Sequence, residues 1–207
     1  MKPIRLLTAV LLGGSLLAAP MRAAAETPGD AVRGRTVFTS KQCARCHKPR
    51  GQQALGPPLE ELRKRQGVLE LAGRLWNHAP AMFEVLEWEG LEWPRISATE
   101  MRDLLAYLRA KTLWDPIPNT SAGYVTLVRK GCLKCHRLRG EGGSAGIELM
   151  KYHGGYVSPL VWATTIWNHS PQMAEHARRM SLLYPRFTGE EMVNLFGFLK
   201  HAAASSQ

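Results

Sequence analysis

The stretch Cys43-Ala44-Arg45-Cys46-His47 recurs later in the chain as Cys132-Leu133-Lys134-Cys135-His136. Together the two copies use all four cysteines of the 207 residues, which leaves no thiol for a disulfide. In each copy the cysteines are three positions apart, a spacing that places both thiols on one side of a helical turn. The histidine directly behind them offers a ring nitrogen beside the two sulfur atoms. These two motifs therefore define what the fold is built around.

A Cys-x-x-Cys pair followed by histidine is the attachment signature of covalently bound c-type haem. Each thiol can add to a vinyl group of one porphyrin, and the histidine can then ligate its iron. A thioredoxin-like redox pair and half of a two-Cys, two-His zinc site are the competing interpretations of one Cys-x-x-Cys. Two copies, each with its histidine, favour two haem c groups. The attachment residues would be Cys43, Cys46, Cys132 and Cys135, with His47 and His136 as the proximal iron ligands.

Residues 1–25 have the pattern of an export signal. Lys2 and Arg5 give a positive start, residues 6–19 are mostly apolar, and three alanines at 23–25 provide a cleavage site. About 14 apolar residues are too few to span a bilayer comfortably, and no cysteine follows them for lipid attachment. We expect a mature chain without a transmembrane segment in a bacterial periplasm, which suits covalent haem attachment. An uncleaved N-terminal anchor is the alternative.

The chain is basic, with 27 Lys and Arg against 17 Asp and Glu and a formal net charge of +10. Residues 1–25 hold three basic residues and no acidic one, so their removal lowers the charge to about +7 (10 − 3). The four propionates of two haems would lower it to about +3. Dispersed Lys and Arg in an exported chain argue against a nucleic-acid partner. A positive face that attracts an acidic redox partner protein and an ordinary solvated surface both fit this charge.

The similarity between the two halves extends beyond the motifs. Trp76-Asn77-His78 matches Trp167-Asn168-His169, and both blocks continue through a proline to a methionine. Other matching pairs are Gly34 with Gly123, Trp93-Pro94-Arg95 with Tyr184-Pro185-Arg186, and residues 100–108 with 191–199. Two single-residue insertions explain the small drift in offset between matching residues. The sequence thus predicts a tandem duplication.

The halves meet at Trp114–Thr120, where two prolines interrupt helix and restrict the residues before them. We therefore predict an export signal at 1–25 and haem domains at 26–115 and 119–207. Each domain is small for a core of its own, which a large flat cofactor would fill.

The helix signals agree between the halves. Ser97–Glu100 and Thr188–Glu191 are both typical of capping boxes, and apolar residues follow them at helical spacing. A helix is expected to enter each Cys-x-x-Cys-His, and another to precede each Trp-Asn-His. No segment alternates convincingly as a strand does, so the sequence predicts an all-α fold.

This order of features resembles a class I cytochrome c domain, occurring twice as in periplasmic dihaem cytochromes c. The resemblance covers residues 27–203 and rests on six features in order: a glycine-led helix, the Cys-x-x-Cys-His motif, Gly56-Pro57-Pro58-Leu59, a middle helix, a methionine and a capped terminal helix. It implies a few helices wrapped around each haem. In that family the proline step supports the proximal histidine through a backbone carbonyl. Here the second copy has Gly146-Ile147-Glu148-Leu149, so we expect a less constrained second haem with a different potential.

The sixth iron ligand separates an electron carrier from an enzyme, because a protein ligand there keeps substrate off the iron. The candidates that pair across the halves are His78 with His169, Met82 with Met173, and Met101 with Met192. Met101 and Met192 follow helix caps on an apolar stripe and are expected in the core.

Met82 and Met173 are the favoured distal ligands, since Ser170-Pro171 is typical of an N-cap and first residue of a short helix that would hold Met173 in its first turn. His78 and His169 are the alternative. Trp76 and Trp167 are expected in the core, with an indole contact to a haem propionate as a hypothesis. His153, His176 and His201 occur in one half only and are assigned no role.

These features predict a dihaem c-type cytochrome that transfers single electrons between periplasmic redox partners. Two alternatives stay open. The chain could be an enzyme with one open haem, a peroxidase or an oxidoreductase of sulfur or nitrogen compounds, although the paired ligand candidates favour two similar sites. It could also be the electron-outlet subunit of a dehydrogenase or respiratory complex, which the sequence does not separate from a free carrier.

Overall fold

The structure, a computed structural model, describes residues 28–59, 66–152 and 155–205. The expected export signal at 1–25 and His153 lie outside the described residues. The described part is mainly helical, which confirms the all-α expectation, with one short hairpin of β1 (Arg137–Leu138) and β2 (Glu141–Gly142) that the sequence does not predict. None of the described helices is long and apolar enough to cross a membrane.

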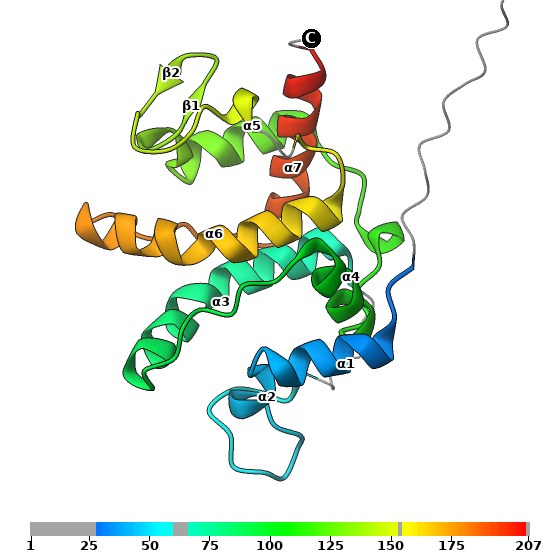
Figure 1. Ribbon diagram of the computed structural model, residues 1–207. Helices are drawn as coiled ribbons and strands as arrows, with labels where there is room; N and C mark the ends of the chain where they lie inside the picture. The colour runs from blue at the N-terminus through cyan, green and yellow to red at the C-terminus, as the bar shows by residue number, and fades with distance from the viewer. Residues whose placement is uncertain (1–27, 60–65, 153–154, 206–207) are drawn as a thin grey trace, which may run out of the picture.

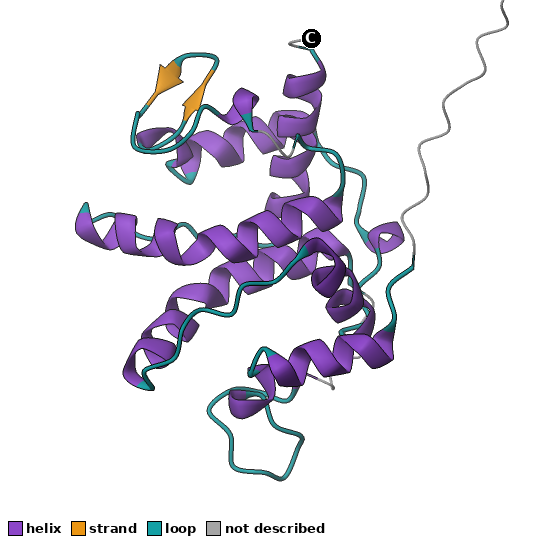
Figure 2. Ribbon diagram, viewed as in Figure 1, coloured by secondary structure: helices purple, strands orange, loops and turns teal. Residues whose placement is uncertain are grey.

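The described helices fall into two sets of similar order (Figure 1). The N-terminal set is α1 (Ala31–Ser40), α2 (Cys43–Cys46), α3 (Val68–Trp88), α4 (Ala98–Tyr107) and the 3₁₀ turn η2 (Thr112–Trp114). The C-terminal set is α5 (Thr120–Arg129), the 3₁₀ turns η3 (Cys132–Lys134) and η4 (Leu149–Lys151), α6 (Pro159–Arg179) and α7 (Glu191–Ala204). Helix α1 packs on α4, α5 packs on α7, and the long helices α3 and α6 pack on each other in the centre (Figure 2).

The first helix of each set is anchored in the same way. Asp30 caps α1 by accepting from Val32 N at 2.8 Å, and Asn119 caps α5 by accepting from Ala122 N at 2.9 Å. The backbone N–H groups of Asp30 and Asn119 then donate to the side chains of Asp103 in α4 and Asn194 in α7, both at 2.8 Å. These bonds fix the entry of the chain toward each cysteine motif.

Glycine allows these helix pairs to cross closely. A Cβ atom at Gly34 would lie 2.0 Å from the carbonyl oxygen of Asp103, and one at Gly123 would lie 2.0 Å from that of Asn194. No side chain fits at such distances, so both crossings require glycine.

The central helices run through prolines that the sequence suggests as helix starts. Helix α6 continues from Pro159 to Arg179 through Pro171, and α3 likewise contains Pro80. Ser170 is buried and its hydroxyl donates to Ile166 O within the helix, so it does not act as an N-cap. The expectation that Met173 lies in the first turn of a short helix is therefore wrong.

A contact between the two sets compensates for the lost helical bond. Pro171 has no N–H to donate to Trp167 O, four residues earlier. The indole N–H of Trp93, which precedes α4, donates to that carbonyl at 3.2 Å. A contact from the segment between α3 and α4 thus offsets a cost that argues against an unbroken helix when the sequence is considered alone.

Only one of the two expected capping boxes is complete. Ser97 Oγ accepts from Glu100 N at 3.2 Å, and the Glu100 carboxylate accepts from Ser97 N at 2.8 Å, as predicted. In the second half the Glu191 carboxylate accepts from Thr188 N at 2.7 Å, but α7 begins at Glu191 and Thr188 does not cap it. Gly189, with φ of +51°, turns the chain between them.

The core contains the two methionines expected there. Met101 is 0% and Met192 1% exposed, which confirms that both lie in the core. Met192 also has a polar partner, because the indole N–H of Trp162 donates to its sulfur at 3.2 Å. Such a contact satisfies a buried donor inside an apolar core.

Asp115, from the expected linker, caps the start of α3. The N-cap residue Gly67 has no side chain to offer, and Leu69 N and Glu70 N donate to Asp115 Oδ1 at 2.9 and 3.3 Å. The other carboxylate oxygen is buried and has no hydrogen-bond partner among the described residues. Burial raises the pKa of Asp115 to about 6. The folded state therefore binds this proton more tightly than the unfolded chain, in which an Asp titrates at about 3.9.

We expect Asp115→Asn to stabilise the protein at pH 7 by about 1 kcal/mol, a figure reduced because the carboxylate is partly exposed and screened. Asparagine keeps the accepting oxygen and removes the charge. In the unmodified protein, the contribution of Asp115 to stability falls as the pH rises from about 4 to about 6 and is constant above that. Urea unfolding of both proteins at pH 4, 5, 6 and 7 measures this. A loss of stability at pH 7 in the variant would show instead that the helix terminus needs the negative charge.

Candidate functional site

In the N-terminal half, α1 delivers the chain to the first Cys-x-x-Cys-His motif, whose cysteines lie in the single turn α2. The turn closes with His47 N donating to Cys43 O at 2.9 Å, and His47 is buried. Its ring Nδ1 lies 2.9 Å from Pro57 O, while Gly56 N donates to Cys46 O at 2.9 Å. The proline step supports the histidine as expected, and Nε2 is left as the nitrogen available to a metal.

The second motif has the same set of bonds. His136 N donates to Cys132 O at 2.9 Å, Gly146 N donates to Cys135 O at 2.7 Å, and His136 Nδ1 lies 3.1 Å from Ile147 O. The expected loss of the carbonyl support in this half is therefore wrong, while the different potential of the second haem stays a prediction. The supporting group is a main-chain carbonyl, which any residue provides, so the loss of both prolines leaves the bond in place.

Glu148 provides the stiffness that the prolines give the first loop. Its carboxylate accepts from the backbone N–H groups of Arg139 and Gly140, each at 2.9 Å, and of Met150 at 3.3 Å. These bonds join the β1–β2 hairpin to the segment that carries Ile147. Both histidines are thus held by a main-chain carbonyl, and in the second half Glu148 bonds to the backbone beside that carbonyl.

Both loops also approach the histidine ring closely. A Cβ atom at Gly56 would lie 2.6 Å from the His47 ring, and one at Gly146 would lie 2.5 Å from His136 Nδ1. A larger residue would push the ring away or move the carbonyl that holds it.

The first cysteine of each motif is a largely buried thiol. Burial raises the pKa of Cys43 and of Cys132 to about 11, so both are neutral thiols at pH 7. Nucleophilic redox chemistry requires the thiolate, which is disfavoured at these two positions. Among residues 28–59, 66–152 and 155–205, no group of three or more His, Cys, Asp or Glu side chains could hold a metal ion. The described residues therefore provide no further ligands that would complete a two-Cys, two-His zinc site.

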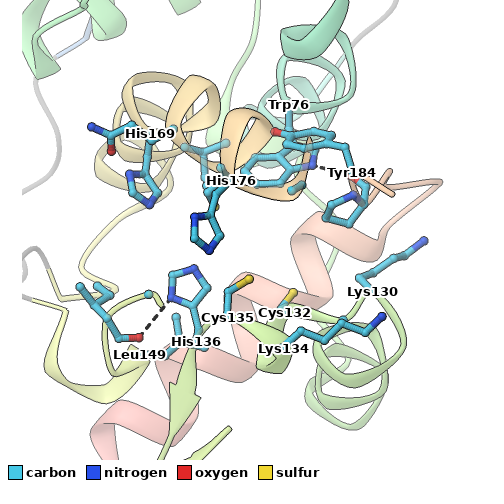
Figure 3. A pocket seen from close by; sticks show the side chains of 18 of the residues that line it. Trp76, Lys130, Cys132, Lys134, Cys135, His136, Leu149, His169, His176 and Tyr184 are labelled. Atoms are coloured by element: carbon cyan, nitrogen blue, oxygen red, sulfur yellow. Dashed lines mark hydrogen bonds between the residues drawn. The ribbon is translucent and has the colours of Figure 1, made fainter. Parts of the chain in front are cut away.

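A cavity of about 740 Å³ lies beside the second motif (Figure 3). Such a volume is within the range of cofactor and ligand sites. Its apolar lining includes Leu127, Tyr156, Trp162, Ile166 and Leu199, and Cys132, Cys135 and His136 lie along one side. A large, flat, mostly apolar cofactor attached at these residues would fit this lining.

Helix α6 places three candidate iron ligands on the wall across from His136. His169, Met173 and His176 are spaced at i, i+4 and i+7, which puts them on one helix face, and all three line the cavity. Figure 3 shows the imidazoles of His169 and His176 projecting from this helix into the space above the His136 ring. The structure thus brings His136, His169 and Met173 together around one cavity.

In the N-terminal half, His78 lies across from His47. The centres of their rings are 6.2 Å apart. Two imidazoles bound to one metal ion through bonds of about 2.0 Å have ring centres about 6 Å apart, so this spacing suits an iron between them. Met82 lies one turn further along α3, partly buried against the core.

Both distal histidine candidates favour the neutral form. Partial burial lowers the pKa of His78, and the charges of His47 and Arg186 lower it further. Burial lowers the pKa of His169, against an opposing hydrogen bond with Gln172. A neutral imidazole has the lone pair that a metal ion needs.

His176 also lines the cavity, although the comparison of the two halves of the sequence assigns it no role. Its Nε2 atom is buried and has no hydrogen-bond partner in the described part of the chain. The equivalent position in the first half is Val85, so the pairing rule that selects the other candidates gives His176 no weight. An orphaned imidazole nitrogen facing a cavity indicates a ligand that the protein atoms alone do not provide.

The Trp-Asn blocks connect the two halves. Trp76 Nε1 donates to Pro185 O at 2.6 Å, and Trp167 Nε1 donates to Pro94 O at 2.7 Å. Each indole N–H is used by the opposite half, so the hypothesis that it contacts a propionate is wrong. Trp76 also stacks on Tyr184 with ring centres 4.7 Å apart.

The asparagines next to these tryptophans bind the same segments from both sides. Asn77 donates to Phe187 O at 2.6 Å and accepts from Phe187 N at 2.7 Å. Asn168 donates to Ile96 O at 2.7 Å and accepts from Ile96 N at 2.9 Å. We call these two reciprocal contacts the Trp-Asn clamps: Trp76 and Asn77 hold residues 185–187, and Trp167 and Asn168 hold residues 94–96.

Comparison with known proteins defines the class of the N-terminal half. Residues 31–112, which include α1–α4, match the cytochrome c family. These residues form one cytochrome c domain, which binds haem c covalently, and the protein is a haem electron-transfer protein. No curated protein and no solved structure matches the chain.

Proposed function

We propose that the chain is a dihaem cytochrome c, with a second haem c on Cys132, Cys135 and His136, in a duplicated domain over residues 119–207. It transfers single electrons between redox partner proteins. The export pattern at residues 1–25 supports a periplasmic location, and the exposed Lys134 in the second motif supports an acidic-faced partner.

One set of hydrogen bonds, present in both halves, supports the assignment of the second haem. In both halves the proximal histidine bonds through Nδ1 to a main-chain carbonyl, and the glycine before that carbonyl bonds to the second cysteine. In a cytochrome c domain this arrangement orients the iron ligand. Its recurrence beside a 740 Å³ cavity supports the same role in the C-terminal half.

We assign His78 as the sixth ligand of the first haem, ahead of Met82. The preference for methionine rests on a short helix starting at the proline and on the order of features in class I cytochromes c. The first of these fails, because α3 and α6 run through their prolines. The ring spacing from His47 supports His78. In the C-terminal half, equivalence favours His169, and His176, whose buried Nε2 has no hydrogen-bond partner in the described part of the chain, is the second candidate. Two histidine ligands would give lower potentials than His/Met ligation, because methionine raises the potential.

The haem, when bound, supplies a one-electron couple between ferric and ferrous iron. The protein residues attach it, fix the orientation of the proximal imidazole and fill the distal position. A filled distal position excludes substrate from the metal, which favours an electron carrier over a peroxidase or another oxidoreductase.

Carbon monoxide binding to the reduced protein tests this function. We expect the unmodified protein not to bind it, His78→Ala to bind one carbon monoxide per chain, and the matched variant Met82→Ala to behave like the unmodified protein. Visible absorption spectra measure all three. Binding to Met82→Ala alone would move the ligand to methionine. Rapid binding to the unmodified protein, together with peroxide turnover, would identify an open haem and an enzyme.

A further inference from the structure

We propose that the two halves exchange arginines: Arg95 of the N-terminal half pairs with a propionate of the haem in the C-terminal half, and Arg186 does the converse. The inference rests on the proposed second haem. Each haem pocket would then be completed by an arginine from the opposite half.

The cavity beside the second motif is lined by positively charged side chains and by none that is negatively charged among the described residues. The basic residues that line it are Arg95, Lys130, Lys134 and Arg179, and no Asp or Glu is among the described residues that line it. A haem brings two carboxylates, and a cationic site without acidic residues matches that charge.

Arg95 is the arginine in this set that has no carboxylate partner. Lys130 pairs with Glu191 at 2.7 Å, and Arg179 pairs with Glu175 at 3.4 Å. In the described part of the chain, no carboxylate forms an ion pair with the guanidinium of Arg95. The same holds for Arg186. These two arginines are therefore available for an anionic ligand.

The backbone around both arginines is fixed by the opposite half. Trp167 and Asn168 hold Pro94 and Ile96, the two neighbours of Arg95. The Arg95 carbonyl also accepts from Lys41 Nζ at 2.7 Å. The clamp therefore directs a residue of the N-terminal half into the cavity that contains His136.

Arg186 has the reciprocal position. Trp76 and Asn77 hold its neighbours Pro185 and Phe187. Trp76 and Asn77 directly precede His78 in α3. Each clamp thus fixes an arginine of one half against the long helix that carries the distal ligand candidates of the other.

Replacing Arg95 with glutamine tests the exchange, because loss of a nearby positive charge favours the oxidised haem. A unit charge about 12 Å from a redox centre, at an effective dielectric constant of about 20, changes the ratio of its oxidation states by about tenfold. For a one-electron couple this is ~59 mV. Arg95→Gln should lower the potential of the second haem by about this amount and leave the first unchanged, and Arg186→Gln should do the reverse.

The potentials are measured by redox titration of the full-length holoprotein, followed by proton NMR, in which each haem has its own set of shifted methyl signals. Magnetisation transfer to Tyr156, which lines the second cavity, identifies the second haem. Arg95→Lys keeps the positive charge and should leave the potential of the second haem close to that of the unmodified protein. Arg179→Gln removes a paired cation from the same cavity and should also change this potential little. Circular dichroism establishes that each variant is folded.

Three outcomes would overturn the exchange: a shift of the first haem alone in Arg95→Gln, equal shifts of both haems, or no shift. Each of these leaves the proposed function intact. A protein with fewer than two haems would instead contradict the proposed function, so the two failures are distinguishable.

Discussion

Replacing Asn77 and Asn168 together with alanine is expected to weaken the contact between the two halves by about 4 kcal/mol. Each side chain makes two hydrogen bonds to the backbone of the opposite half. Truncation leaves a backbone N–H and a carbonyl without partners at each clamp, and an unsatisfied buried polar group costs about 1–3 kcal/mol. Chemical denaturation of the holoprotein measures the change.

The same experiment tests whether the halves fold as one unit. Because the clamps cross from α3 and α6 to the segments before α7 and α4, we expect one cooperative transition in the unmodified protein and two in the double variant. Asn194→Ala is the matched control. That residue makes one exposed hydrogen bond within the C-terminal half, to Asn119 N, and its loss should cost about 1 kcal/mol. Two separate transitions in the unmodified protein would contradict the role of the clamps.

Replacing Cys132 and Cys135 together with alanine is expected to reduce the haem content from two groups per chain to one. Both thioether bonds of the second haem would be lost, while Cys43 and Cys46 would keep the first. The matched pair Cys43→Ala with Cys46→Ala should also leave one haem. Haem staining of the denatured protein, in which only covalent haem remains, measures both variants. An unchanged haem content after the loss of Cys132 and Cys135 would show that the second motif does not attach haem.

The sequence predicts those parts of the molecule that depend on local spacing. The Cys-x-x-Cys-His motifs, the helices that enter them and the buried positions of Met101 and Met192 all follow from neighbours within a few residues. The first capping box, Ser97–Glu100, is of the same kind. Its counterpart at Thr188 fails because Gly189 turns the chain before the helix begins.

The parts that the sequence does not predict depend on distant partners. Trp76 and Asn77 find their acceptors more than 100 positions away, so no local pattern assigns them to the contact between the halves. The unbroken helix through Pro171 depends on Trp93 in the same way. The support behind His136 is a main-chain carbonyl, and residue identity says little about it. His176 has no counterpart in the first half, which removes the signal that selects the other ligand candidates.

The central claim is that one chain carries two haems, and the pyridine haemochrome assay of the purified, unmodified protein tests it most directly. The protein concentration must come from amino-acid analysis, since haem absorbance interferes with other methods. We expect two c-type haems per chain. A value of one would confine haem to the cytochrome c domain at residues 31–112 and contradict the dihaem assignment.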